Sequence, residues 1–179
     1  MQLTDSKDIL VSPAVVWAAI LNPEVLKQCV PGCESMTGSV AEGFTAIVVA
    51  RVGPVKATFT GGVTLSDIVA GQAVKISGDC KGGPAGHAKG SASVTLDPIE
   101  GGTRLSYEVE AAVGGKLAQL GSRIIDGFAK KMADEFFERF QSAVEAPDED
   151  PELVGAEGDA DAGGDGEIKK GWFKRLIGV

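Results

Sequence analysis

Apolar and polar residues alternate with a period of two from residue 43 to residue 113, in five consecutive runs separated by short turns. Side chains two positions apart lie on the same face of a β-strand, so each run predicts a strand with one dry and one wet face. The first turn is Gly53-Pro54, which joins the runs 44–52 and 55–65. Consecutive strands with short turns are typical of an antiparallel meander.

After Gly114-Gly115 the apolar period changes to 3.6, which predicts a long amphipathic helix ending near Ala143. Its apolar stripe contains Leu117, Leu120, Ile124, Phe128, Met132, Phe136 and Phe140. Before the meander, Ser12-Pro13 is a typical helix start and Asn22-Pro23 a stop, so short helices are expected at 13–20 and around 24–28. The order strand, short helices, meander and long helix predicts an α+β domain in which a curved antiparallel sheet wraps around a long C-terminal helix.

The residues expected on the dry face of the sheet are unusually small. They are Ala57, Gly61, Gly78, Ala88, Gly90, Ala92 and Ala111. A filled core would carry larger branched side chains at most such positions. We favour a ligand-sized apolar cavity between sheet and helix, with a tightly bent sheet pressed against the helix as the alternative. The residues expected to line the ligand space are Phe44, Phe59, Tyr107, Leu117, Leu120, Ile124 and Phe128.

Charge divides the chain into three parts. The net charge is −8, and nine Asp and Glu residues lie in 146–167 without any Lys or Arg. That composition cannot offset chain entropy by burial, so we expect a domain at 1–145 and a disordered acidic linker at 146–167. Residues 168–179 predict a short amphipathic helix that attaches reversibly to an anionic membrane surface, or alternatively docks on its own domain or a partner. Its expected membrane-binding residues are Lys169, Lys170, Trp172, Phe173, Lys174, Arg175, Leu176 and Ile177.

Several classes of function are disfavoured by composition. The domain has no basic stripe, which argues against nucleic-acid binding. The N-terminal residues lack the pattern of a secretory signal and no apolar run reaches the length of a spanning helix, so we expect a cytoplasmic location. Cys29, Cys33 and Cys80 match no zinc spacing, and His87 is the sole imidazole; we therefore expect free thiols, no metal site and no catalytic set.

Several short segments together resemble one known family. They are residues 29–34 (CVPGCE), 51–56 (RVGPVK), 86–90 (GHAKG), 113–121 (VGGKLAQLG) and the pair Phe136-Phe137. This combination is similar to the G-subunit family of carbon monoxide dehydrogenase, which belongs to the helix-grip superfamily of lipid-transfer and polyketide-cyclase-like proteins. The resemblance extends over nearly all of residues 1–145.

The resemblance implies a non-catalytic accessory protein that brings a molybdenum-type CO dehydrogenase to the inner face of the cytoplasmic membrane. It also implies a hydrophobic cavity, for which respiratory quinone, either menaquinone or ubiquinone, is the natural ligand because the enzyme's electrons must reach the respiratory chain. No covalent cofactor is expected. Two alternatives remain: a docking adaptor with a solid core, and a cyclase or hydrolase of the same fold, which would need polar groups inside the cavity. The dry faces offer only Tyr107 and Cys80 for that purpose.

Overall fold

The computed structural model describes residues 1–146 of the chain. The linker and the amphipathic segment expected at 146–179 lie almost wholly outside these residues. The elements, in chain order, are β1 (Gln2–Ile9), α1 (Pro13–Ile20), α2 (Pro23–Cys29), β2 (Cys33–Ser39), β3 (Gly43–Val52), β4 (Val55–Val69), β5 (Ala73–Lys81), the 3-10 turn η1 (Gly83–Ala85), β6 (His87–Ile99), β7 (Gly102–Gly114), α3 (Lys116–Gln119) and α4 (Ser122–Glu145).

One antiparallel sheet contains all seven strands in the order β1-β7-β6-β5-β4-β3-β2. The five strands predicted from the alternation, β3 to β7, are present and pair in sequence. The N-terminal strand β1 forms the sheet edge opposite β2 by pairing with β7, from Gln2 opposite Glu110 to Ile9 opposite Thr103. Strand β2 is not predicted by the pattern, because its sequence CESMTGS is short and polar and lacks an apolar alternation.

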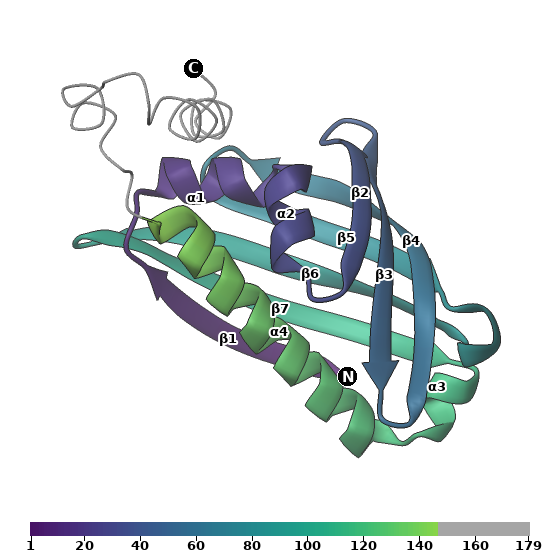
Figure 1. Ribbon diagram of the computed structural model, residues 1–179. Helices are drawn as coiled ribbons and strands as arrows, with labels where there is room; N and C mark the ends of the chain where they lie inside the picture. Colours follow the sequence, from purple (N-terminus) through teal and green to yellow (C-terminus); the bar gives the residue numbers. More distant parts are fainter. Residues whose placement is uncertain (147–179) are drawn as a thin grey trace, which may run out of the picture.

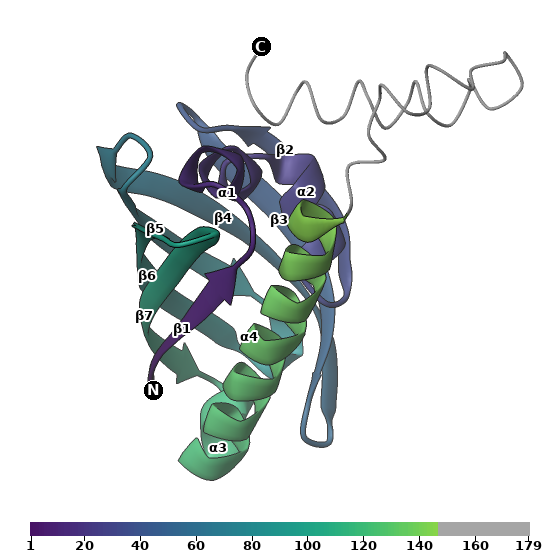
Figure 2. The same cartoon turned by 90° about the vertical axis from the view of Figure 1, so that its left-hand side faces the viewer.

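Helix α4 lies along the concave side of the sheet, with α1 and α2 at one end of the sheet and α3 at the other (Figures 1 and 2). We call these the α1 end and the α3 end. This confirms the expected fold, a curved sheet wrapped around a long helix. The main core fills the α1 end, where α1, α2 and the C-terminal half of α4 pack on β1, β6 and β7. Phe140 is fully buried there, and the rings of Tyr107 and Phe137 stack with centroids 4.7 Å apart.

The long helix is interrupted at Gly121, whereas the sequence predicts one continuous helix from 117 to about 143. Gly121 has a φ of 89°, a left-handed conformation that a glycine adopts without steric cost. The chain therefore forms the short α3, turns, and begins again as α4 at Ser122. As a result Leu117 and Ile124 do not share a helical face: Leu117 is buried, and Ile124 is 40% exposed.

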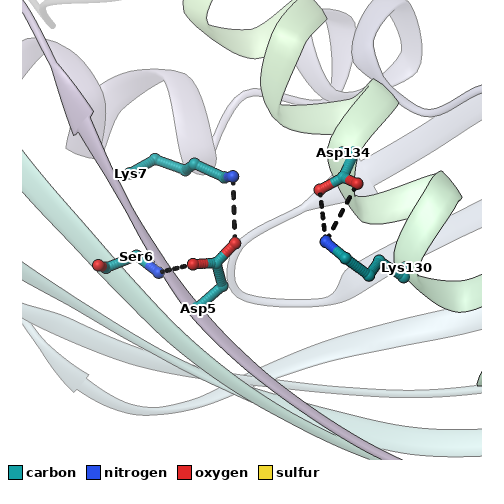
Figure 3. A network of polar contacts seen from close by, with 5 residues as sticks. All are labelled: Asp5, Ser6, Lys7, Lys130 and Asp134. Atoms are coloured by element: carbon teal, nitrogen blue, oxygen red, sulfur yellow. Dashed lines mark hydrogen bonds and ion pairs between the residues drawn. The ribbon is translucent and has the colours of Figure 1, made fainter.

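Charged side chains of the edge strand β1 face charged side chains of α4. Asp5 and Lys7 project from β1 toward the helix, where Lys130 and Asp134 form a second ion pair (Figure 3). The Ser6 backbone amide and then Lys7 hold the pKa of Asp5 below its usual value, and Lys130 adds to this effect. Such inward-pointing charges protect an edge strand from pairing with another chain. Charged side chains of both elements thus lie along this side of α4.

Candidate ligand-binding site

A cavity of about 360 Å³ lies between the middle of the sheet and the N-terminal half of α4. Its walls are nearly all apolar. Pockets for small molecules usually have volumes of roughly 300–1,000 Å³, so this space can hold a ring or a short stretch of chain. It is not sealed from solvent.

Two rows of small residues that cross the strands form the floor of the cavity. In the first row Ala46, Gly61, Cys80, Ala88 and Val113 lie opposite one another on β3 to β7. In the second row Val63, Gly78, Gly90 and Ala111 are paired in the same way. All nine residues line the cavity. Because these side chains extend only a short distance above the sheet, they leave space beneath the helix that larger residues would fill.

Larger residues fill the sheet on both sides of these rows. Toward the α1 end, Leu65, Ile76 and Val109 pack against the main core. Toward the α3 end, a second apolar cluster is formed by Val52, Phe59, Ala85 and Leu117, with partly buried neighbours. We call it the end cluster. The cavity is therefore a gap between two packed regions.

Glycine in the floor also permits close approach of the strands. A Cβ atom on Gly61 would lie 2.3 Å from the carbonyl oxygen of Asp79, and one on Gly90 would lie 2.6 Å from that of Glu110. Neither distance is compatible with a side chain, so these strands come together only because glycine is present. The sheet is therefore tightly coiled at its glycines, as the alternative explanation of the small residues required, but it is not pressed against the helix there, because a cavity lies between them.

The roof comes from one face of α4 and from the loop after α2. Ile125, Phe128 and Met132 are spaced by three and four residues, so they share a face of the helix. Val30, which follows α2, lines the cavity from the side of β2. Nothing in the sequence singles out Val30. Ile125 is absent from the predicted stripe because the interruption at Gly121 shifts the helical register.

Three of the seven residues expected to line the ligand space do line the cavity, namely Phe59, Leu117 and Phe128. The other four lie elsewhere. Tyr107 belongs to the main core, and Phe44 is buried where β3 begins. Leu120 packs against the end cluster, and the side chain of Ile124 lies against the turn at Gly53. The prediction of these four residues rested on a continuous helix and on the size of their side chains. Neither of these indicates where along the sheet a cavity forms.

The polar chemistry of the lining is limited. Asp79 and Lys89 border the cavity but are exposed, and they lie opposite one another in the register of β5 and β6, without forming an ion pair. Cys80 is the lining residue with a polar side-chain atom on the dry face. Desolvation raises the pKa of its thiol, against a smaller lowering by a hydrogen bond with the Ala88 backbone, so the thiol is neutral at pH 7. Among residues 1–146, no group of three His, Cys, Asp or Glu side chains is placed to hold a metal ion.

Tyr107 does not offer its hydroxyl to the cavity. Desolvation raises its pKa to about 12, and Asp5 and Asp134 add to the shift. Asp5 lies on β1 and Asp134 on α4, where each forms an ion pair within its own element. The two other thiols are Cys29, which is buried with a pKa raised to about 11 by desolvation, and Cys33, which is half-buried.

The family of the chain follows from a sequence match that covers most of the described domain. Residues 6–145 match the family described as the G subunit of carbon monoxide dehydrogenase (CoxG). The chain belongs to the CoxG family. Among curated proteins, none matches the chain.

Solved structures place this CoxG-family chain among helix-grip proteins. A conserved protein from Geobacillus kaustophilus is 26% identical with a TM-score of 0.76, over 82% of this chain and 96% of that one. A protein from Chromobacterium violaceum is 16% identical with a TM-score of 0.62, over 80% and 96% of the two chains. Ara h 8.0201 is 17% identical with a TM-score of 0.57, over 82% and 98%. The last two similarities concern the fold alone.

The CoxG match begins and ends within the helix-grip domain, so residues 147–179 lie outside it. Within residues 1–146, no helix is both long and apolar enough to cross a membrane. The function of the tail, residues 147–179, must therefore be inferred from its own sequence. The function of the domain must be inferred from the cavity and the surface around it.

Proposed function

We propose that this chain is a non-enzymatic accessory protein of a molybdenum-type CO dehydrogenase, which it recruits to the inner face of the cytoplasmic membrane, and that its cavity binds a hydrophobic molecule, respiratory quinone. The observation that carries the ligand proposal is the apolar cavity above the two rows of small residues. The CoxG family match supports the enzyme as partner.

The cavity favours recognition by apolar contact over recognition of a polar head. Burial of apolar ligand surface contributes about 25 cal/mol per Å², so covering about 200 Å² would supply roughly 5 kcal/mol. The polar side-chain partner available on the dry face is the thiol of Cys80, which is a weak donor. Menaquinone and ubiquinone should therefore bind with similar affinity. An isoprenoid tail longer than the cavity would extend outside it.

The membrane part of the proposal rests on the sequence of residues 168–179. Four cations and four large apolar residues alternate there as they do in interfacial helices. Each cation contributes on the order of 1 kcal/mol near an anionic surface, so attachment would be reversible and sensitive to salt. The protein would then be cytoplasmic and peripheral, and it could bring both enzyme and quinone to the bilayer.

The proposal is tested by extracting the full-length protein, purified without detergent, with organic solvent and analysing the extract by mass spectrometry. A bound isoprenoid quinone is expected. A sample without any co-purified lipid is then titrated with short-chain ubiquinone and menaquinone analogues. If neither analogue binds, the ligand proposal is wrong and a docking adaptor is the better description. Pelleting with vesicles and with CO dehydrogenase tests recruitment separately.

A further inference from the structure

The exposed charges of the domain are distributed unequally between its two ends. At the α3 end, Arg51, Lys56, Lys81, Lys89, Lys116 and Arg123 are all exposed, together with the acidic residues Asp79 and Asp126. At the α1 end, the hairpin turns carry or adjoin Glu42, Asp67, Asp97 and Glu100. Six of the thirteen Lys and Arg residues in 1–145 therefore lie at the α3 end, whereas Lys27, Lys75, Arg104 and Arg139 lie toward the α1 end. We call the six cations at the α3 end the basic ring.

Strand pairing and loop packing bring the basic ring together. Arg51 lies opposite Lys56 next to the turn at Gly53, and Lys81 lies opposite His87. Lys56 and Lys116 border the same surface groove beside η1. Within residues 1–146, none of the six cations lies within ion-pair distance of a carboxylate. Their charge is therefore available to an external partner.

The α3 end also exposes apolar side chains. Ile124 is 40% exposed, and its Cγ2 atom lies 3.2 Å from the position that a Cβ on Gly53 would take. The exposed Pro54 is next to it. Exposed apolar side chains beside unpaired cations are the composition of a surface that enters the headgroup region of an anionic bilayer.

The basic ring also includes Lys116 of α3, the element that closes the cavity at this end. Leu117 of α3 lines the cavity and is 3% exposed, while its neighbour Lys116 belongs to the ring. Helix α3 lies between Gly115 and Gly121, both of which have positive φ. A bilayer in contact with the basic ring would touch α3 and the end cluster.

We propose that the α3 end docks on anionic lipid, with the basic ring on the headgroups and Ile124 and Pro54 at the interface, so that the cavity loads from the bilayer through this end. The loading step rests on the proposed function, whereas docking does not. Anionic lipid is favoured over an acidic protein because Ile124 and Pro54 expose apolar surface beside the cations.

Charge reversal of the full-length protein tests the docking surface. Lys56→Glu/Lys116→Glu changes the basic ring, and Lys27→Glu/Lys75→Glu is the control with the same net charge. Binding is measured by sedimentation with phosphatidylcholine vesicles, with and without about 30% phosphatidylglycerol. At about fivefold per cation, the ring variant should bind anionic vesicles about 25-fold or more weakly. The control should change less than about threefold. All variants retain residues 147–179, so the tail contributes equally.

A lipid-quenching experiment tests the orientation. Ile124→Trp introduces an indole at the α3 end, and Leu10→Trp introduces one at a site that is 70% exposed near the α1 end. On vesicles containing brominated phosphatidylglycerol, the added fluorescence of Ile124→Trp should be quenched more strongly. Trp17 and Trp172 provide the same background in both variants.

Three outcomes would overturn the docking surface: equal loss of vesicle binding in both double variants, no loss in either, or stronger quenching for Leu10→Trp. If the Lys56→Glu/Lys116→Glu variant loses binding to CO dehydrogenase but binds vesicles unchanged, the basic ring contacts an acidic protein. That result would also overturn the docking of the ring on lipid. Failure of the quinone analogues to bind in solution, combined with the expected vesicle results, would reject the ligand proposal and leave the docking surface standing.

Discussion

Replacing Ala88 by leucine should fill the cavity and weaken ligand binding without destabilising the fold. Ala88 lies in the first row of small residues, opposite Cys80 and Val113, and lines the cavity. Leucine adds three carbon atoms. If they displace three buried ligand carbons at about 0.8 kcal/mol each, the loss is about 2.4 kcal/mol, or about 50-fold in Kd. Since the new atoms occupy empty space, the free energy of unfolding should change by less than about 1 kcal/mol.

Ala92→Leu is the matched control on the same strand and the same dry face. Ala92 does not line the cavity; it lies opposite Ile76 and Val109, which pack against the main core. The added carbons should therefore overpack a filled region, costing about 1–3 kcal/mol of stability, and leave Kd nearly unchanged. Sequence alone would have offered Ala92→Leu and Gly61→Val as cavity fillers. Gly61→Val is unsuitable because its Cβ would collide with the Asp79 carbonyl.

The assay combines calorimetric titration with a short-chain quinone analogue and urea unfolding of the same samples. The two variants should show opposite profiles, with Ala88→Leu losing affinity and Ala92→Leu losing stability. If both variants lose stability equally and neither changes Kd, the space above the small residues is filled in solution, and the cavity does not bind the ligand.

Other consequences follow from the placement of single groups. A bound quinone analogue should protect Cys80 from maleimide more than it protects Cys33, as measured by peptide mass spectrometry, and equal labelling with and without ligand would place the ligand elsewhere. Without ligand, the rate of Cys80 alkylation should continue to rise above pH 9.0, because desolvation raises the pKa of its thiol above that value. Tyr107→Phe should leave the affinity for the quinone analogue unchanged, and a large loss of affinity would contradict the placement of Tyr107 outside the cavity. Tyr107→Ala should lower the free energy of unfolding by roughly 3–5 kcal/mol, since the Tyr107 ring packs in the main core. Hydrogen bonding by Arg104 lowers the pKa of Asp8 below 3.8, so the pair stabilises the folded state above that pH and this stabilisation is lost as the pH falls through the lowered pKa. The melting temperature of Asp8→Asn should accordingly lie below that of the parent at about pH 6 and converge with it on acidification, and a constant difference would contradict the linkage.

Local patterning in the sequence was enough to predict the strands β3 to β7, the helices at both ends of the meander and the α+β class. These follow from short-range periodicity, because a period of two or 3.6 fixes which side chains share a face. The same patterning indicated that the dry face carries too little side-chain volume for a filled core. The polar strand β2 has no such pattern, and its place at the sheet edge comes from pairing with β3.

Where the missing volume becomes a cavity depends on long-range packing. Strand register aligns Gly61, Cys80 and Ala88 in one row, whereas Ala92, on the same face, lies beside large residues. The left-handed Gly121 separates α3 from α4 and thereby moves Ile124 to the surface. The basic ring likewise joins residues from six separate elements, β3 to β6, α3 and α4. Each of these features depends on which distant residues become neighbours, and local periodicity carries no information about that.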